Sequence, residues 1–568
     1  MRKKRNSTTG QLLLFGLAAV LFISLAIYGV QANWFGGRQA ASVPNGDHTA
    51  GGSTVPDPPG GSDLQDPPPK DSASPGSGNP VPPAEPQKPV IPEETVDVAV
   101  IGSELEGMYL ARAAADEGLS VKVIDPRAEI GGQLLQGEML FLDDTKDDSG
   151  KTLTQGRIKQ LFDGFKSGKI RKKEEYVQYF DELRNNIPIE SGISIAEVFT
   201  QPAPAGKSGD AAVTGVLYRT KDGQLKRLNA AYWVENTDFA ALASQLDVTR
   251  LPGLEAFYGH PNHIEYMASG MMMKFKNVDW NAFSKHFNSL SAAERNQKYG
   301  AGWVNESYAI GLTGMTNRYK VTNDRVFLRG LNAVNQRDGE VLINAFLIYG
   351  VDPSDPDSIA EALELGRKEI PLIAEHFRKS MVGWEKAELN GFPNYLYIRE
   401  YNHYETEYVL KPSDMLGGRM FWDNVSIGGY PLDLQGTSYN KWGIEMGRPD
   451  KYGMPLRSFL LKRYENVIMA GKNVGASAIA YGSARIQPNT GIAAESIGVI
   501  LGQIHGKKKL KELTEADMPA LHQYLESKYK IKVYGVKGKN KLEGWTEEEI
   551  RKLDTGEIIY AHYAPRRK

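Results

Sequence analysis

The stretch from 96 to 125 restricts the fold of this chain more than any other part of its sequence. VDVAVI is a short, mostly apolar run typical of a buried strand, and Gly102 follows it. Apolar residues then recur at helical spacing, and Gly118 stands where such a helix would end. A second run, VKVID, ends in Asp125. Strand, glycine turn, helix and strand within about 30 residues predict a parallel βαβ unit and an α/β fold.

The turn after the first strand predicts a dinucleotide site. Gly102 permits a tight turn, Gly107 allows the helix to pack closely on the sheet, and Asp125 is placed to accept hydrogen bonds from a ribose. The amides at the helix N-terminus suit a pyrophosphate. Glu104 stands where the pattern has its second glycine. Either its carboxylate points to solvent and the site survives, or the site has lost its ligand.

The next segment narrows the choice of family. AEIGGQLLQGEML places Gly131 and Gly132 just after the strand that ends in Asp125, and Gly137 follows. This arrangement resembles the FAD-dependent oxidoreductases of the glutathione-reductase-like fold, in which a double-glycine segment passes beside the flavin. In that family the middle glycine of the first turn is often replaced by a small residue, so Glu104 is a further departure.

A remote segment, residues 452–504, is similar to the closing region of the same family. It contains an apolar strand (467–470), a Gly-x-Asn turn and a stretch rich in Ala, Ser and Gly that reaches Arg485. Asn489 or Thr490 is expected to cap a helix that runs from Gly491. In the family this helix points its N-terminus at the flavin, where its dipole would stabilise the anion that develops at N1 when hydride reaches N5.

Two intermediate segments extend the resemblance to roughly 94–525. Residues 231–246 correspond to a strand and turn that in relatives contains Asp-Ala-Thr-Gly; here Thr237 is kept, and Asn236 and Asp238 replace the alanine and the glycine. Residues 395–436 match the family at Arg399, Glu400, Asp414, Gly429, Tyr430, Pro431 and Asp433. Asn402 and His403 replace its basic pair.

The resemblance implies an α/β fold with a discontinuous Rossmann-type FAD-binding domain. Its two parts are residues 94–244 and 396–508, and residues 245–395 form an inserted α+β substrate or cap domain, because they mix helix-period and strand-like runs. Residues 509–568 are predicted to be a helical tail. Contacts with FAD are assigned to Gly102, Ser103, Glu104, Gly107, Asp125, Gly131, Gly132, Gln133, Gly471, Asn473, Arg485, Asn489, Thr490 and Gly491.

His403, with Tyr404 and the nearby Arg399, is the candidate acid–base group. Histidine titrates near neutrality, and a tyrosine can donate a proton in a dry pocket. A structural, hydrogen-bonded histidine is the alternative. Arg485 is assigned either to a substrate carboxylate, to the flavin, or to an ordinary buried ion pair.

The composition excludes other classes of protein. The chain has no cysteine, so disulfides, thiolate metal sites and cysteine nucleophiles are absent, and redox chemistry needs a cofactor. A net charge of -2 provides no field that would select nucleic acid. HPNH (260–263) lacks a third ligand, so no metal site is predicted. An NAD-only dehydrogenase explains neither IGGQLLQG nor the closing helix.

The N-terminus predicts export. Four basic residues (2–5) precede nineteen uncharged residues, 12–30, which as a helix would span about 28 Å, close to the thickness of a bilayer core. A retained anchor places the rest of the chain outside the cell, and cleavage after Ala32 would release it. Residues 40–93 hold fourteen of the 31 prolines. They are expected to be a semi-extended tether or, alternatively, a tolerated disordered insert.

These features together predict a membrane-tethered or secreted FAD-dependent oxidoreductase, on the outer face of a bacterial membrane of Gram-positive type. It would move a hydride from a small organic substrate to flavin N5, and its electron acceptor is left open. Because 104, 236 and 238 all depart from the family at phosphate-facing turns, the alternative is a degenerate flavoprotein fold that serves as a non-catalytic binding or scaffold protein at the cell surface.

Overall fold

The computed structural model describes residues 91–203 and 209–567. The predicted anchor, its cleavage site and almost all of the predicted tether lie outside these residues. Within the two described ranges, no helix combines the length and the hydropathy that crossing a bilayer requires.

The first sheet contains seven strands of the described chain, in the order β3-β2-β1-β6-β5-β4, with β18 beside β6. They are β1 (Glu93–Ile101), β2 (Val121–Asp125), β3 (Ile189–Ser191), β4 (Ser194–Gln201), β5 (Ala212–Arg219), β6 (Leu225–Glu235) and β18 (Val467–Met469). β1 is parallel to both β2 and β6, and β18 runs parallel to the end of β6. β4 and β5 extend the sheet as antiparallel strands. The predicted α/β fold with a discontinuous parallel sheet is confirmed.

β1 is buried on both faces, which explains its continuous apolar run. Val98 and Val100 point into the core that includes helix α2 (Leu105–Asp116), while Ala99 and Ile101 point into a second core on the other face. After α2 ends, Gly118 adopts φ +91°, as expected of a residue that follows a helix. The predicted βαβ unit therefore forms with the expected order and burial.

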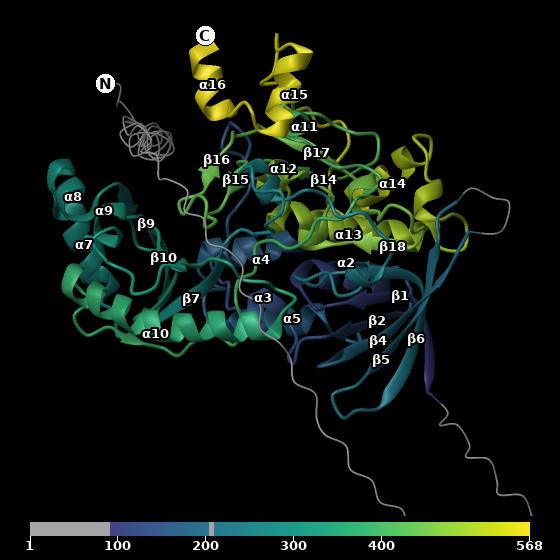
Figure 1. The fold of residues 1–568 in the computed structure, drawn as a ribbon, viewed down its shortest axis with the longest axis horizontal. Helices are drawn as coiled ribbons and strands as arrows, with labels where there is room; N and C mark the ends of the chain where they lie inside the picture. Colours follow the sequence, from purple (N-terminus) through teal and green to yellow (C-terminus); the bar gives the residue numbers. More distant parts are fainter. Residues whose placement is uncertain (1–90, 204–208, 568) are drawn as a thin grey trace, which may run out of the picture. The chain divides into compact units, whose positions relative to one another are not determined.

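Helix α13 (Gln487–Ile504) lies against α2, and the two are side by side in Figure 1. Gly498 makes this close packing possible, because a Cβ on it would lie 2.5 Å from the carbonyl oxygen of Leu110. The predicted cap is wrong: α13 begins at Gln487, its N-cap Ile486 makes no side-chain cap, and Asn489 and Thr490 lie inside the first turn. Pro488 explains the earlier start, since proline is tolerated in a first turn.

The remaining elements of the nucleotide-binding part surround this α2–α13 pair. They are α3 (Gly132–Leu135), α4 (Gly156–Ser167), α5 (Lys173–Leu183), α11 (Pro412–Leu416), α12 (Ala478–Ala484) and the strand pairs β14 (Asn424–Gly428) with β17 (Tyr452–Pro455) and β15 (Asp433–Leu434) with β16 (Ile444–Glu445). Short 3-10 turns occur at Ala243–Gln245, Leu456–Phe459, Gly471–Asn473 and Leu510–Glu512.

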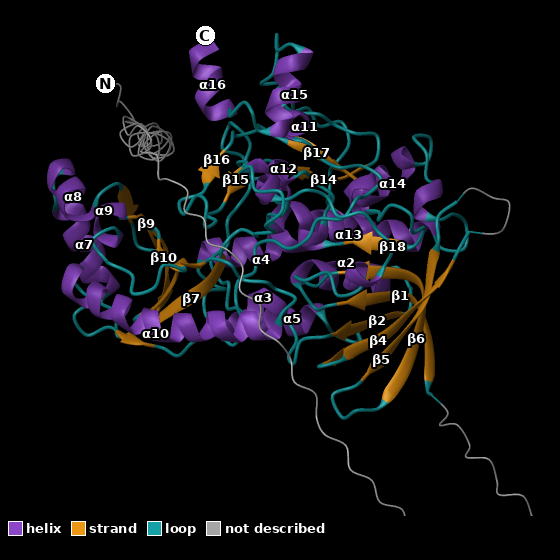
Figure 2. Cartoon of the chain, viewed as in Figure 1, coloured by secondary structure: helices purple, strands orange, loops and turns teal. Residues whose placement is uncertain are grey.

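A second sheet lies within the predicted insert, as Figure 2 shows. Its strands are β7 (Ser269–Lys276), β8 (Gly302–Val304), β9 (Tyr308–Gly311), β10 (Val326–Leu328), β11 (Leu331–Arg337), β12 (Glu340–Ile348) and β13 (Glu388–Leu389), and the helices are α6 (Leu254–Phe257), α7 (Trp280–Ser289), α8 (Ala292–Tyr299), α9 (Thr313–Thr316) and α10 (Pro356–Ser380). The separate core of this part runs from Met271 to Ile398.

The C-terminal residues form α14 (Met518–Tyr524), a π-helical turn (Leu525–Tyr529), α15 (Glu547–Thr555) and α16 (Tyr560–Arg567). Leu525 and Ile531 are fully buried in the same core as α13. The tail therefore completes the nucleotide-binding part.

We expect Gly498→Ala to lower the free energy of unfolding. Alanine normally stabilises a helix interior by about 1 kcal/mol relative to glycine, but here its Cβ would lie 2.5 Å from backbone of α2, so a helix has to shift. Thermal unfolding followed by circular dichroism measures whether the substitution stabilises or destabilises the protein.

Gly164→Ala in α4 is the matched control. Its Cβ would lie 2.5 Å from Cδ1 and 2.7 Å from Cγ1 of Ile170, which can rotate, and no backbone atom is among its three nearest neighbours. Equal stabilisation by both substitutions would contradict the packing of α13 on α2.

Candidate functional site

Four segments that are far apart in the sequence meet at the carboxyl ends of β1 and β6. The Gly107 amide donates to Asn236 Oδ1 at 2.7 Å. Asn473 Nδ2 donates to the Thr237 carbonyl at 2.9 Å, and the Thr490 hydroxyl donates to Glu106 at 2.9 Å. The structure therefore brings together the turn after β1, the turn after β6, the Gly-x-Asn turn and the start of α13, as the motifs predicted.

The acid at the end of β2 is satisfied by the turn itself. Asp125 is fully buried, and its Oδ2 accepts from the Ser103 amide at 2.8 Å and from the Ser103 hydroxyl at 2.5 Å. The same hydroxyl accepts from the Gly131 amide at 2.8 Å. Gly102 adopts φ +93°, and a Cβ on it would lie 2.7 Å from the Asn236 carbonyl. The two turns thus pack directly against each other.

Glu104 points inward. Only 1% of it is exposed, and its carboxylate oxygens each lie 3.1 Å from the Gln133 amide, which donates to them. Gly131 and Gly132 have φ values of +90° and +47°, and the Gln133 amide after them donates to an anion, as in the anion-binding backbone turns called nests. A Cβ on Gly132 would lie 2.3 Å from the Glu104 carboxyl carbon, so only glycine fits there. Of the two alternatives that the sequence left open, the one in which this carboxylate points to solvent is therefore wrong.

Arg127 is the cation that makes this burial possible. Its Nη1 lies 2.6 Å from Glu104 and 3.5 Å from Asp238, and its Nε lies 3.3 Å from Asp125. Burial alone would lower the pKa of Arg127, but the three carboxylates outweigh it and raise that pKa well above its usual value. Sequence reasoning missed Arg127, although its place two residues after a strand-ending acid was a signal.

Asp238 occupies the facing turn. It is 3% exposed, and its Oδ2 is buried without a hydrogen bond, 3.9 Å from Lys472 Nζ. Lys472 donates to Gln133 Oε1 at 3.0 Å and to the Ile398 carbonyl at 2.8 Å. Lys472 lies between the predicted residues Gly471 and Asn473, and it too was missed because the motif records only its neighbours.

The start of α13 is also closely packed. The Asn489 amide group donates to the Ser483 carbonyl at 2.8 Å, while its Oδ1 is buried without a partner. A Cβ on Gly491 would lie 2.6 Å from Ile158, and a Cβ on Gly471 would lie 2.9 Å from the Asn236 amide nitrogen. These predicted residues therefore lie next to the turns, in the interior of the protein.

The three predicted catalytic residues do not converge on one point. His403 Nε2 lies 2.8 Å from Glu400, and its ring packs edge-on against Tyr481. Arg399 Nη1 donates to the Ala268 carbonyl at 2.7 Å, toward the insert. Tyr404 belongs to the core on the far face of the first sheet, and burial raises its pKa to about 12. The geometry at His403 is that of a carboxylate-paired histidine.

A cluster of arginines lies where the insert meets the nucleotide-binding part. Burial lowers the pKa of Arg399 to about 9, and Arg329 and Arg485 act in the same direction. The Nε atoms of Arg329 and Arg485 are buried without hydrogen bonds. Burial also raises the pKa of Asp143 to about 6. Of these residues, Arg399 and Arg485 were singled out from the sequence, but Arg329 and Asp143 carry no motif that marks them.

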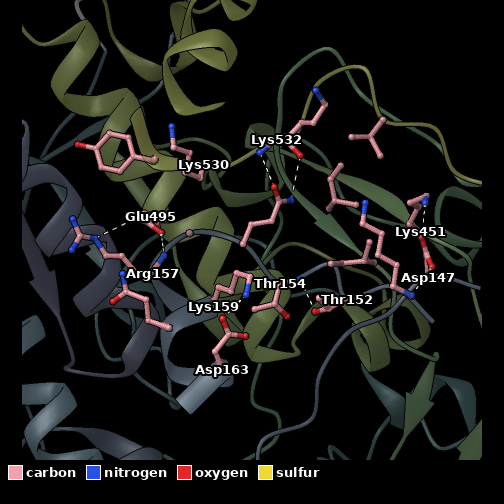
Figure 3. A pocket seen from close by; sticks show the side chains of 18 of the residues that line it. Asp147, Thr152, Thr154, Arg157, Lys159, Asp163, Lys451, Glu495, Lys530 and Lys532 are labelled. Carbon is pink, nitrogen blue, oxygen red and sulfur yellow. Dashed lines mark hydrogen bonds and ion pairs between the residues drawn. The ribbon is translucent and has the colours of Figure 1, made fainter. Parts of the chain in front are cut away.

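A cavity of about 780 Å³ lies between the start of α4, the loop before it and the C-terminal segment (Figure 3). Lys151, Arg157, Lys530 and Lys532 line it together with the buried Glu495, which accepts from the Arg157 amide at 2.7 Å. None of the residues predicted from the sequence lines this cavity.

Comparison with known proteins identifies a family. A model of the family described as FAD dependent oxidoreductase matches residues 97–525. A search of curated proteins found no match.

Among solved structures, a geranylgeranyl bacteriochlorophyll reductase-like protein from Thermoplasma acidophilum has a TM-score of 0.31 and 11% identity, covering 77% of this chain and 84% of that one. A p-nitrophenol 4-monooxygenase from Pseudomonas putida has the same TM-score and identity, covering 82% of this chain and 94% of that one. The family assignment rests on the family model.

We expect Glu106 to make stability depend on pH. Burial, and then the neighbouring Glu104, raise the pKa of Glu106 from 4.5 to about 7. Between these values the folded chain holds a proton that the unfolded chain has lost, so the free energy of unfolding falls as pH rises and levels off above pH 7. Glu106→Gln should remove up to about 3 kcal/mol of that fall, since one pKa unit is worth about 1.4 kcal/mol.

Urea denaturation at several pH values measures this slope. Thr490→Val is the matched control, because it removes the hydrogen bond to Glu106 and keeps the titrating carboxyl group. An unchanged slope in Glu106→Gln would show that other groups carry the pH dependence.

Proposed function

Because this chain belongs to the FAD-dependent oxidoreductase family, we propose that it removes a hydride from a small organic substrate and delivers it to N5 of FAD. Family, enzyme class and cofactor agree with the expectations from the motifs. The observation that carries the proposal is the convergence of the predicted cofactor segments at the turns after β1 and β6, where Glu104 and Lys472 also contact Gln133.

The donors around the Gly131–Gln133 nest fit a pyrophosphate. The Gln133 amide at the end of this turn already donates to a carboxylate, and Arg127 and Lys472 supply two cations beside it. Arg127 and Lys472 would hold the phosphates, with the Gln133 amide between them. FAD supplies the two-electron acceptor when it is bound. The carboxylates of Glu104 and Asp238 occupy the same donors in this structure and have to move away for the phosphates to enter.

The substrate would be held between the insert and the start of α13. The unpartnered Nε atoms of Arg329 and Arg485 favour a substrate with an anionic group, because buried guanidinium donors need acceptors. His403 would take up the proton that leaves the substrate with the hydride, and Glu400 at 2.8 Å would stabilise the charged imidazole. The hydride carries two electrons and one proton to the flavin, and the second proton of the substrate passes to His403.

The proposed location is the outer face of the cell membrane, or the exterior if the chain is cleaved after Ala32. The basic residues 2–5 and the uncharged stretch 12–30 support this proposal. The proline-rich residues that follow would hold the catalytic part away from the bilayer. The final electron acceptor is then oxygen or a membrane carrier.

One observation favours a second candidate, a non-catalytic binding or scaffold protein. The side chains of Glu104, Asp125 and Asp238 are all buried and paired within the protein. A chain in which these pairs never open would keep the fold without its cofactor.

Titration of the purified full-length protein with FAD separates the two candidates. We expect saturable binding, seen as quenching of flavin fluorescence and as a structured flavin absorption band in the visible range. A concentration-dependent rise in the melting temperature should accompany it.

Riboflavin, which has the ring but no phosphate, is the matched control ligand and should bind more weakly. Absence of any saturable binding by FAD, in the wild type and in variants of the turn, would remove the oxidoreductase proposal in favour of the second candidate.

A further inference from the structure

The three residues that depart from the family pattern are Glu104, Asn236 and Asp238. Each of them contacts a backbone amide or a cation at the nucleotide turns. Glu104 takes the Gln133 amide and Arg127, and Asn236 takes the Gly107 amide. Asp238 faces both Arg127 and Lys472. The three side chains therefore bind the backbone amides of Gly107 and Gln133 and the cations of Arg127 and Lys472, instead of leaving these groups free for a ligand.

The position of Glu104 matches that of an anionic ligand. Its two oxygens share one backbone amide and its Oε1 forms a charge-assisted contact of 2.6 Å with a guanidinium, which is how a phosphate is held in such a nest. Gly132 has no Cβ, and the space thus left is filled by the carboxylate. The cradle is intact, and an internal anion lies in it.

The charges show why a pyrophosphate and this carboxylate exclude each other. Three buried carboxylates, those of Glu104, Asp125 and Asp238, surround two cations, Arg127 and Lys472. When these five groups are ionised they carry one negative charge in excess, before the buried Glu106 beside Glu104 is counted. Adding the two negative charges of a pyrophosphate without displacing a carboxylate would leave buried anions without partners, which is strongly unfavourable.

We propose that Glu104 determines the affinity of this chain for FAD by competing, as an internal anion, for the donors of the pyrophosphate. The inference rests on the proposed function. FAD binds only to molecules in which the Glu104 side chain has left the nest, so its apparent dissociation constant is raised by the reciprocal of the fraction in that state. The side chain can leave by rotation about its own bonds, and the backbone that forms the cradle stays in place.

The competition makes FAD a dissociable cofactor. Full-length wild-type protein should retain less than one FAD per chain after gel filtration, and excess FAD should restore occupancy. Glu104→Gly removes the competitor and opens the nest. If the open state is populated at about 1–10%, this variant binds FAD roughly 10- to 100-fold more tightly.

Two further variants separate charge from shape. Glu104→Gln keeps the size and the acceptor for the Gln133 amide but loses the ion pair with Arg127, so a smaller gain in affinity is expected. Glu129→Gln is the matched control: it removes an exposed carboxylate from the same segment, two residues before Gly131, and should leave FAD affinity unchanged. Fluorescence titration gives the dissociation constants.

Melting without ligand provides a readout that is independent of activity. Glu104→Gly should lower the melting temperature of the apoprotein, because Arg127 loses its closest carboxylate partner, and FAD should raise it by more than in the wild type. Asp238→Asn, which also removes a carboxylate facing Arg127, should tighten FAD binding independently of Glu104.

The outcomes are distinct. If wild type saturates with FAD and neither Glu104 variant binds more tightly, the competition is overturned and the oxidoreductase proposal stands. If Glu104→Gly binds FAD and wild type does not at any concentration, the competition is supported and the wild-type chain is the non-catalytic candidate. If no variant binds FAD, both proposals fail.

Discussion

The buried guanidinium of Arg127 organises the region around the nucleotide turns. It lies among three carboxylates that come from the end of β2, the turn after β1 and the turn after β6. A buried cation of this kind is stable only if its partners stay in place, because the loss of one leaves charge without compensation in a poorly polarisable interior. Arg127 therefore joins the two turns, and the position of Glu104 in the nest follows from that constraint.

Much of the fold could be predicted because its signals are local. The run VKVID became β2 with the same bounds, and the glycine turn and the helix after β1 formed as their periodicity indicated. The discontinuous sheet could also be predicted, because residues 452–504 resemble the closing region of the family. In the structure, β18 from that region pairs with β6 beside β1. The insert was recognisable as α+β from its mixed periodicity, and it contains a second sheet with its own core.

The parts that escaped prediction depend on contacts between distant residues. Arg127 and Lys472 gain their roles only when the turns meet, and no short motif marks such a meeting. The start of α13 was placed too late because the polar side chains of Asn489 and Thr490 were interpreted as caps, whereas the helix already begins at Gln487, with Pro488 in its first turn. His403 is close to Arg399 in sequence, yet the His403 ring pairs with Glu400, whereas the Arg399 guanidinium donates to the Ala268 carbonyl of the insert.

The packing of α2 against α13 has a consequence for how the chain is made. α2 ends at Asp116 and α13 begins at Gln487, so the apolar surface of α2 has no lasting cover until nearly the entire polypeptide has left the ribosome. Contacts of such long range form slowly, and an uncovered apolar helix invites aggregation while it waits. A truncated product that ends before residue 487 would keep a complete βαβ unit and an open core. Such a product is a natural substrate for chaperones and proteases.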